Sequence, residues 1–174
     1  GCYPPEGQIT LAENEIPEIA KQAFIAAEDS SFYEHQGLDF KRIIGALIVD
    51  LRKGSFEQGA STITQQVVRT YLLSSEKTVS RKIREAFLAR RIEKNLSKEQ
   101  ILTLYLNRVY LGSGAYGIEA ASLRYFGKSC RELGLAEIAM IAGLAPAPAT
   151  YSPLSDFEAA KTRQRYVLGR MAQD

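Results

Sequence analysis

The sequence contains no tryptophan, one histidine and two cysteines, and each shortage narrows what the chain can be. Cys2 and Cys130 form no CxxC pair and no Cys/His ligand spacing, which argues against a zinc site. Cys2 lies beside the start of the sequence, so a Cys2–Cys130 bridge is disfavoured, and the two thiols do not identify a redox compartment. His35 has no cysteine or second histidine near it, so no metal ligand set is predicted.

Long hydrophobic runs and a strong charge imbalance are also missing. No stretch of about 18 apolar residues could span a bilayer, and no signal peptide is present, although a separated catalytic domain would lack both in the same way. The 22 basic and 20 acidic residues give a net charge of +2, which argues against a nucleic-acid-binding protein. The ordinary composition, 45% hydrophobic and 24% charged, predicts one globular domain over residues 1–174.

What the sequence does contain is helical periodicity, with few alternating β patterns. Apolar residues repeat at helical spacing from Pro17, which suits a first helical turn, to about Glu28. Ser97 and Gln100 make a capping box before another helix. The sum is an all-α domain of roughly eight or more helices. Helices are predicted at residues 17–28, 39–52, 62–73, 76–95, 98–107, 135–144 and 156–172.

Glycine, proline and polar residues predict the connections. Residues 3–11 are expected to be extended, residues 54–61 to form a loop and residues 111–117 to form a glycine-rich turn. Ser129 with Glu132 offers another cap, and the helix at residues 135–144 is apolar. Prolines 146, 148 and 153 are then expected to break the chain.

Residues 76–95 form the clearest predicted helix. At 100° per residue, Val79, Ile83 and Phe87 fall on one stripe. Leu88 and Ile92 fall on nearly the opposite side. A helix that is apolar on two sides is expected to be buried on two sides.

The same helix carries charge on a face that continues into apolar residues. Arg81 and Glu85 lie at i and i+4, and Lys82 lies three residues before Glu85. Burying charge is costly unless it is paired or used, which favours a functional site. The alternative is an exposed Arg81–Glu85 pair worth roughly 0.2–0.5 kcal/mol, and the pattern alone favours that alternative.

Two adjacent acids, Glu28 and Asp29, follow the apolar stretch at residues 23–27. If the helix continues, Glu28, Phe32 and His35 share a face. A carboxylate at the end of an apolar face can have a raised pKa and act as an acid or base, whereas the alternative is a solvated helix end. For His35, a structural hydrogen bond is favoured over a metal role.

The loop at residues 59–66 offers hydroxyl and carboxamide groups beside a glycine. Such groups donate and accept hydrogen bonds, which suits sugar hydroxyls and phosphate oxygens. Arg69, Lys77, Arg81 and Lys82 follow and could together hold an anion. The alternative, a helix cap followed by a solvated basic helix, is favoured when the segment is taken alone.

A short apolar run at residues 43–49 has basic residues on both flanks. It is too short to cross a bilayer. It could lie in a membrane interface, or it could be a core helix with solvated ends, and both alternatives stay open.

Taken together, five ordered blocks resemble the family-51 glycosyltransferase domain of bifunctional penicillin-binding proteins and monofunctional peptidoglycan transglycosylases. They cover nearly the whole chain. One departure is Ser31, where many similar sequences carry arginine, which removes one possible phosphate contact. The blocks are Glu28-Asp29-x-x-Phe32-x-x-His35-x-Gly37, Gly59-x-Ser61-Thr62-Ile63-Thr64-Gln65-Gln66, Arg81-Lys82-x-x-Glu85, Lys98-x-x-Ile101-Leu102-x-x-Tyr105-Leu106-Asn107-x-x-Tyr110-x-Gly112 and Arg163-x-x-x-Val167-Leu168-x-x-Met171. The fourth block continues through Gly117, Glu119 and Tyr125-Phe126-Gly127.

This resemblance implies a lysozyme-like helical lobe with a smaller, membrane-facing jaw that would include residues 38–56. The implied substrate is lipid II, with the growing lipid-linked glycan strand as donor. The implied location is the extracytoplasmic face of the bacterial cytoplasmic membrane, in partnership with or fused to a transpeptidase. No cofactor is required, although a divalent cation could accompany the pyrophosphate.

The resemblance also implies roles for the candidate residues. Glu28 would be the general base, and Glu85 would position the basic cluster or assist the leaving group. Arg69, Lys77, Arg81 and Lys82 would neutralise the pyrophosphate. A glycan hydrolase using the same two carboxylates, or a non-catalytic peptidoglycan-binding domain, are the alternatives. The remaining substrate-binding candidates are Asp29, Ser61, Thr62, Gln65, Gln66 and Asn107.

Overall fold

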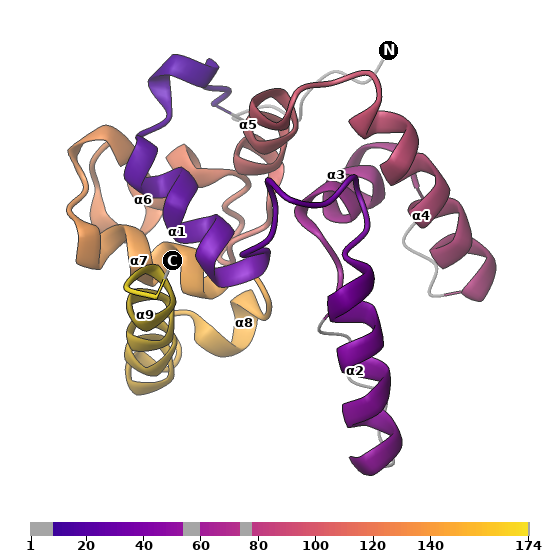
Figure 1. Cartoon of the computed structure of the whole chain (residues 1–174). Coiled ribbons are helices and arrows are strands. Elements are labelled where there is room, and N and C mark those ends of the chain that lie inside the picture. The colour runs from indigo at the N-terminus through magenta and orange to yellow at the C-terminus, as the bar shows by residue number, and fades with distance from the viewer. Residues whose placement is uncertain (1–8, 54–59, 74–77, 174) are drawn as a thin grey trace. The chain divides into compact units, whose positions relative to one another are not determined.

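The computed structural model describes residues 9–53, 60–73 and 78–173, and their regular structure is helical (Figure 1). In these ranges an isolated β-bridge joins Tyr110 and Tyr116, and no strand forms, so the all-α prediction is confirmed. No helix among them is both long and apolar enough to cross a bilayer. The elements are η1 (Glu13–Glu15), α1 (Glu18–Glu28), α2 (Phe40–Lys53), α3 (Ile63–Leu72), α4 (Val79–Glu93), α5 (Lys98–Arg108), α6 (Ile118–Phe126), η2 (Cys130–Glu132), α7 (Leu135–Leu144), α8 (Pro148–Tyr151) and α9 (Phe157–Met171).

The chain divides into two compact units, in keeping with the expected lobe and smaller jaw. The first unit comprises Gly1–Ser30 and Leu102–Asp174, and α1, α7 and α9 pack together in it. Figure 1 shows α7 running beside α9. Gly143 permits this close packing, since a Cβ added there would lie 3.1 Å from the Arg163 Cβ. The apolar α7 therefore forms the centre of this core.

The second unit comprises Ser31–Ile101, and its core lies between α3 and α4. Ile63, Val67 and Val68 of α3 are buried, whereas α4 contributes Glu85 and Ala89 as its buried residues. A carboxylate therefore occupies a place in this small core where an apolar side chain would ordinarily sit. Charge buried in this way requires partners.

The seven helices predicted by periodicity are confirmed as α1 to α5, α7 and α9, with ends that differ by a few residues. α6 and α8 were not predicted. α8 begins at Pro148, which occupies the first helical turn, so the proline that was expected to break the chain instead starts a helix. The segments at residues 1–8 and 54–59 lie outside the described residues.

The predicted cap formed by Ser129 with Glu132 is confirmed, and it begins the short η2 ahead of α7. Ser129 and Glu132 form a capping box at the N-terminus of η2, and the Ser129 N–H donates to Glu132 Oε2 at 3.1 Å. Gly134 precedes α7, and its N–H donates to Glu137 Oε2 at 2.8 Å. The sequence therefore holds two consecutive N-terminal caps where one was predicted.

Helix α1 ends at Glu28 and does not continue, so Glu28, Phe32 and His35 do not share a helical face. The reason is the backbone of Asp29, which leaves the helical region with φ −156° and ψ 69°. The next residues form turns and bends up to the start of α2 at Phe40.

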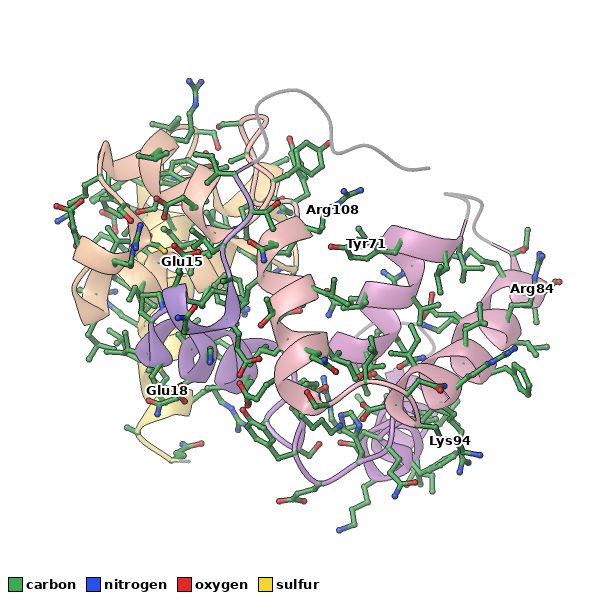
Figure 2. The ribbon with its side chains drawn as sticks, turned by 90° about the horizontal axis from the view of Figure 1, so that it is seen from above. Glu15, Glu18, Tyr71, Arg84, Lys94 and Arg108 are labelled. Carbon is green, nitrogen blue, oxygen red and sulfur yellow. The ribbon has the colours of Figure 1, made fainter. Side chains whose placement is uncertain are left out.

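The expectation that α4 is buried on two sides is wrong. Val79, Ile83 and Phe87 are 78%, 66% and 69% exposed. Periodicity identified the apolar stripe but not what covers it, and α3 covers the opposite face, which carries Glu85. Figure 2 shows Arg84 extending away from the ribbon of α4.

Candidate active site

Glu85 lies at the centre of a charged cluster in the second unit. Its buried carboxylate accepts hydrogen bonds from Arg69 Nε at 3.1 Å and Arg69 Nη2 at 3.3 Å. Lys82 Nζ donates to the same carboxylate at 2.8 Å. Both cations also donate to Ser61 Oγ, Lys82 at 2.8 Å and Arg69 at 3.3 Å. The structure thus brings together four predicted site residues, Ser61, Arg69, Lys82 and Glu85.

The cluster presents positive charge outward. The Arg69 and Lys82 side chains are 38% and 48% exposed, whereas Glu85 is 0% exposed. Burial by itself raises the pKa of Glu85, but the hydrogen bonds and charges of Arg69 and Lys82 outweigh it and hold that pKa below its ordinary value. Glu85 is therefore ionised at neutral pH and serves as an acceptor. Two partly exposed cations that are held in place by a buried carboxylate can bind an anion on their solvent side.

The first turn of α3 holds Ser61 in place through a capping box. Thr62 Oγ1 accepts from the Gln65 N–H at 3.1 Å, and Gln65 Oε1 accepts from the Thr62 N–H at 3.0 Å. Thr62 Oγ1 also donates to the Gly37 carbonyl at 2.7 Å. Thr62 and Gln65 are buried, whereas Gln66 is half-buried. The side chains of Thr62 and Gln65 thus fix the loop that carries Ser61.

Arg81 does not pair with Glu85, so the simple i, i+4 pair of the sequence alternative is absent from the described residues. The Arg81 N–H donates to Thr78 Oγ1 at 3.1 Å in the N-cap of α4. Its Nε is buried and has no hydrogen-bond partner within the described ranges. Lys77 lies outside the described residues.

The second predicted carboxylate lies in the first unit. Glu28 is the half-buried last residue of α1, and Asp29, which is 1% exposed, ends the helix with its N–H donating to Ile25 at 2.8 Å. Tyr105 packs edge-on against Phe24 of α1, with ring centroids 6.0 Å apart. Burial raises the pKa of Tyr105 well above its ordinary value, and the charges of Glu28 and Asp29 raise it further. The prediction that Glu28 ends an apolar helical face is confirmed.

Asn107 and His35 make structural hydrogen bonds. Asn107 Oδ1 accepts from the Leu11 N–H and its Nδ2 donates to the Leu11 carbonyl, both at 2.8 Å. His35 Nδ1 accepts from the Gly37 N–H at 3.1 Å, which confirms the structural bond predicted for this histidine. In the described ranges no group of three or more His, Cys, Asp or Glu side chains is arranged to hold a metal ion.

Ser31 anchors the start of α2. Its hydroxyl donates a short hydrogen bond to Asp39 Oδ2, and Asp39 Oδ1 accepts from the Arg42 N–H at 3.0 Å. Burial raises the pKa of Asp39, but these hydrogen bonds and the charge of Arg42 lower it overall. Position 31 therefore contributes to local structure and supplies no cation.

Comparison with known proteins places this geometry in a family. The family described as Transglycosylase matches residues 5–172. The chain belongs to the transglycosylase family. This confirms the resemblance of the five blocks and makes the domain a peptidoglycan glycosyltransferase by family.

Relatives of this transglycosylase include penicillin-binding protein 1A from Neisseria cinerea, 49% identical over 174 residues, and from Escherichia coli K12, 49% identical over 172 residues. The alignments cover 100% and 99% of this chain but 22% and 20% of those proteins, so the chain spans about a fifth of their length. The crystal structure of penicillin-binding protein 1A from Haemophilus influenzae is similar with a TM-score of 0.55 and 27% identity, covering 94% of this chain and 15% of that one.

Four residues that were assigned no role from the sequence make interactions of note: Thr64, Glu93 and Lys98 bond one another in the second unit, and Tyr105 lies near Glu28 in the first. Three of them stand in the matching blocks, which was the available signal. Glu93 had a weaker one: it lies two turns after Glu85 on the same helix, about 80° further round its axis.

Proposed function

We propose that this domain polymerises lipid II into glycan strands, with inversion at the anomeric carbon and release of undecaprenyl pyrophosphate. The observation that carries this proposal is the outward-facing pair Arg69 and Lys82, held by the buried carboxylate of Glu85. A diphosphate leaving group needs such fixed positive charge, whereas hydrolysis of a neutral glycosidic bond does not. Both units would belong to one catalytic domain over residues 1–174.

In this mechanism Glu28 removes the proton from the 4-hydroxyl of the acceptor sugar. The oxygen attacks the anomeric carbon of the donor strand from the side opposite the pyrophosphate, so the configuration changes from α to β. The bond from the anomeric carbon to the pyrophosphate oxygen breaks, and the lipid pyrophosphate leaves with the electron pair. Arg69 and Lys82 neutralise its charge, and fixed charge of this kind is often the largest catalytic contribution.

Glu85 is proposed to position the two cations, not to donate a proton, because its carboxylate is ionised and accepts from both. Ser61 lies between the cations and would contact pyrophosphate with them. Lys77 and Arg81 would extend the positive surface, and Gln66 would contact sugar or phosphate. Asp29 would act beside Glu28, while Thr62, Gln65 and Asn107 would support the site from the buried positions they occupy.

We further propose that the second unit contacts the membrane that carries the lipid substrate. Helix α2 exposes a series of apolar side chains, and its first turn carries the exposed Lys41, so the helix is amphipathic. Such a helix suits an anionic membrane interface. We propose that this interface is the extracytoplasmic face of the cytoplasmic membrane. A fused transpeptidase is proposed from the greater length of the relatives. The exposed apolar residues are Phe40, Ile44, Leu47, Ile48 and Val49.

The test offers lipid II to the purified protein and separates the products by length. The unaltered protein is expected to make a ladder of glycan strands. Replacing Glu28 with glutamine should reduce chain growth by about 10²–10⁴-fold, the usual contribution of general-base catalysis, with the helical circular dichroism unchanged. Full polymerisation by Glu28→Gln would refute the assigned base.

The same assay separates the alternatives. Shortening of preformed glycan, without growth from lipid II, would indicate a lysozyme-like hydrolase with the same two carboxylates. Binding of glycan without any reaction would indicate a non-catalytic domain. A divalent cation could accompany the pyrophosphate, so the assay is run with magnesium and with a chelator.

A further inference from the structure

Lys98, at the start of α5, makes a set of contacts that the mechanism above does not use. Its Nζ donates to the His35 carbonyl at 2.7 Å and to Glu93 Oε1 at 2.7 Å. The ammonium also lies 4.5 Å from the centroid of the Phe32 ring, within the range of a cation–π interaction. Glu93 Oε1 accepts in addition from Thr64 Oγ1 at 2.6 Å. One ammonium therefore connects the turn after Asp29 to α4 and, through Glu93, to α3.

Two further contacts hold the same turn. Thr62 Oγ1 donates to the Gly37 carbonyl at 2.7 Å. Gly37 has φ +89° and lies directly against α4, since a Cβ added to it would come within 2.8 Å of the Ala89 backbone. The turn at residues 32–37 is thus fixed by α3, α4 and α5 at once, and Lys98 supplies the charged part of that attachment.

These contacts differ from an ordinary surface ion pair. The side chains of Lys98 and Glu93 are 20% and 7% exposed, so the pair is shielded from solvent. Exposed pairs contribute little because water screens them and long side chains lose freedom, whereas a shielded and fully bonded pair fixes one geometry. The ammonium uses a carboxylate, a carbonyl and an aromatic ring as partners, so its position is closely determined.

We propose that Lys98 is a positioning residue for the transferase reaction, acting through the turn at residues 32–37 and without touching substrate. The inference rests on the proposed function. That turn is bonded through the Gly37 carbonyl to Thr62, which caps α3 directly after Ser61, so its attachment reaches the loop that carries Ser61. Ser61 accepts hydrogen bonds from both Arg69 and Lys82, whereas the bonds from these two cations to Glu85 do not involve the turn. Removing the Lys98 ammonium should therefore disturb the turn and the Ser61 loop and leave the ion pairs of Arg69 and Lys82 with Glu85 in place.

The experiment measures kcat and KM for lipid II in the purified intact protein, with Lys98 replaced by methionine. Methionine keeps most of the apolar length and removes the charge. The expected result is a fall in kcat of about tenfold to a hundredfold, the scale of a displacement near 1 Å, with KM changed by less than about twofold. The matched control is Lys94→Met, because Lys94 is an exposed lysine just after α4. This control should keep both constants.

Two companion variants keep the inference testable if Lys98→Met folds poorly. Glu93→Gln retains the shape but weakens the ion pair, and it should lower kcat in the same direction by a smaller factor. Lys98→Arg retains the charge and should recover part of the rate lost by the methionine variant. All rates are compared at a temperature where circular dichroism shows each variant to be folded.

The outcomes separate this inference from the proposed function. If the unaltered protein makes no glycan from lipid II, the proposed function fails and the inference fails with it. If the unaltered protein polymerises and Lys98→Met retains its kcat, even with a lower unfolding temperature, Lys98 only stabilises the fold and the inference alone is overturned. An increase in KM with kcat unchanged would also overturn it, because that result indicates substrate contact.

Discussion

Replacing Glu85 with glutamine tests the central feature of the site, a buried anion beneath two cations. The substitution keeps the size of the side chain and removes its charge. The carboxylate accepts three hydrogen bonds from two cations, at 3.1, 3.3 and 2.8 Å. Hydrogen bonds to charged groups contribute about 1.5–3 kcal/mol each, but the amide retains one acceptor and the half-exposed cations can regain water, so we expect a loss of about 2 kcal/mol in the free energy of unfolding.

The sign of the pH dependence follows from the lowered pKa of Glu85. A carboxyl group whose pKa is lower in the folded state contributes stability above its ordinary pKa, here 4.5, and loses that contribution as the pH falls through the folded pKa. The stability difference between the unaltered protein and Glu85→Gln should therefore be full at neutral pH and shrink in acid. Urea unfolding followed by circular dichroism at several pH values measures it.

Polymerisation by Glu85→Gln should fall by about a hundredfold, because Arg69 and Lys82 lose the group that aligns them with the leaving group. The matched control is Glu119→Gln in the first unit. Glu119 is also buried and ionised, and it accepts from the Cys130 N–H at 2.9 Å. This control should lose stability in a similar pH-dependent way and keep its polymerisation rate. Normal activity of Glu85→Gln, or a stability difference independent of pH, would refute the reasoning.

Two other predictions concern backbone space and thiol chemistry. Gly37→Ala should lower the free energy of unfolding by about 1–3 kcal/mol, because Gly37 has φ +89° and the new Cβ would lie 2.8 Å from the Ala89 backbone. A variant as stable as the original protein in urea unfolding would contradict this prediction. Burial and the neighbouring Glu119 raise the pKa of Cys130 to about 12. Its thiol should therefore not react with iodoacetamide at pH 8 until the protein is unfolded. Rapid labelling of the folded protein, measured by mass spectrometry, would contradict this prediction.

Much of the fold could be predicted because local patterns determine most of these helices. The capping box before α5 formed as predicted, with the Ser97 N–H donating to Gln100 Oε1 at 2.9 Å. α6 was missed because it is short and follows a glycine-rich turn, and Gly117, with φ +85°, directs the chain into it. α8 was missed because Pro148 was interpreted as a helix breaker, although proline also favours the first helical turn.

The site was predicted in part. The spacing of Lys82 and Glu85 placed both on one helix, which a sequence can indicate, but the pair weighed from the sequence was Arg81 with Glu85, whereas the structure pairs Lys82 with Glu85. The bond from Arg69 of α3 depends on how two helices pack, so the sequence indicated the charge but not its partner. The same limit explains the error at Val79, Ile83 and Phe87, since periodicity identifies a face but not its neighbour. That Glu28 and Glu85 serve one reaction stays a prediction.

The buried carboxylate has a consequence for inhibitor design. With one negative and two positive groups, the formal charge of Glu85, Arg69 and Lys82 together is only +1. A compound with a single negative charge therefore competes with a resident anion for the same donors and should gain little affinity. A compound with two adjacent anionic groups can contact the outer side of both cations at once, so selectivity for this pair of cations should follow the number and spacing of the charges that the compound carries.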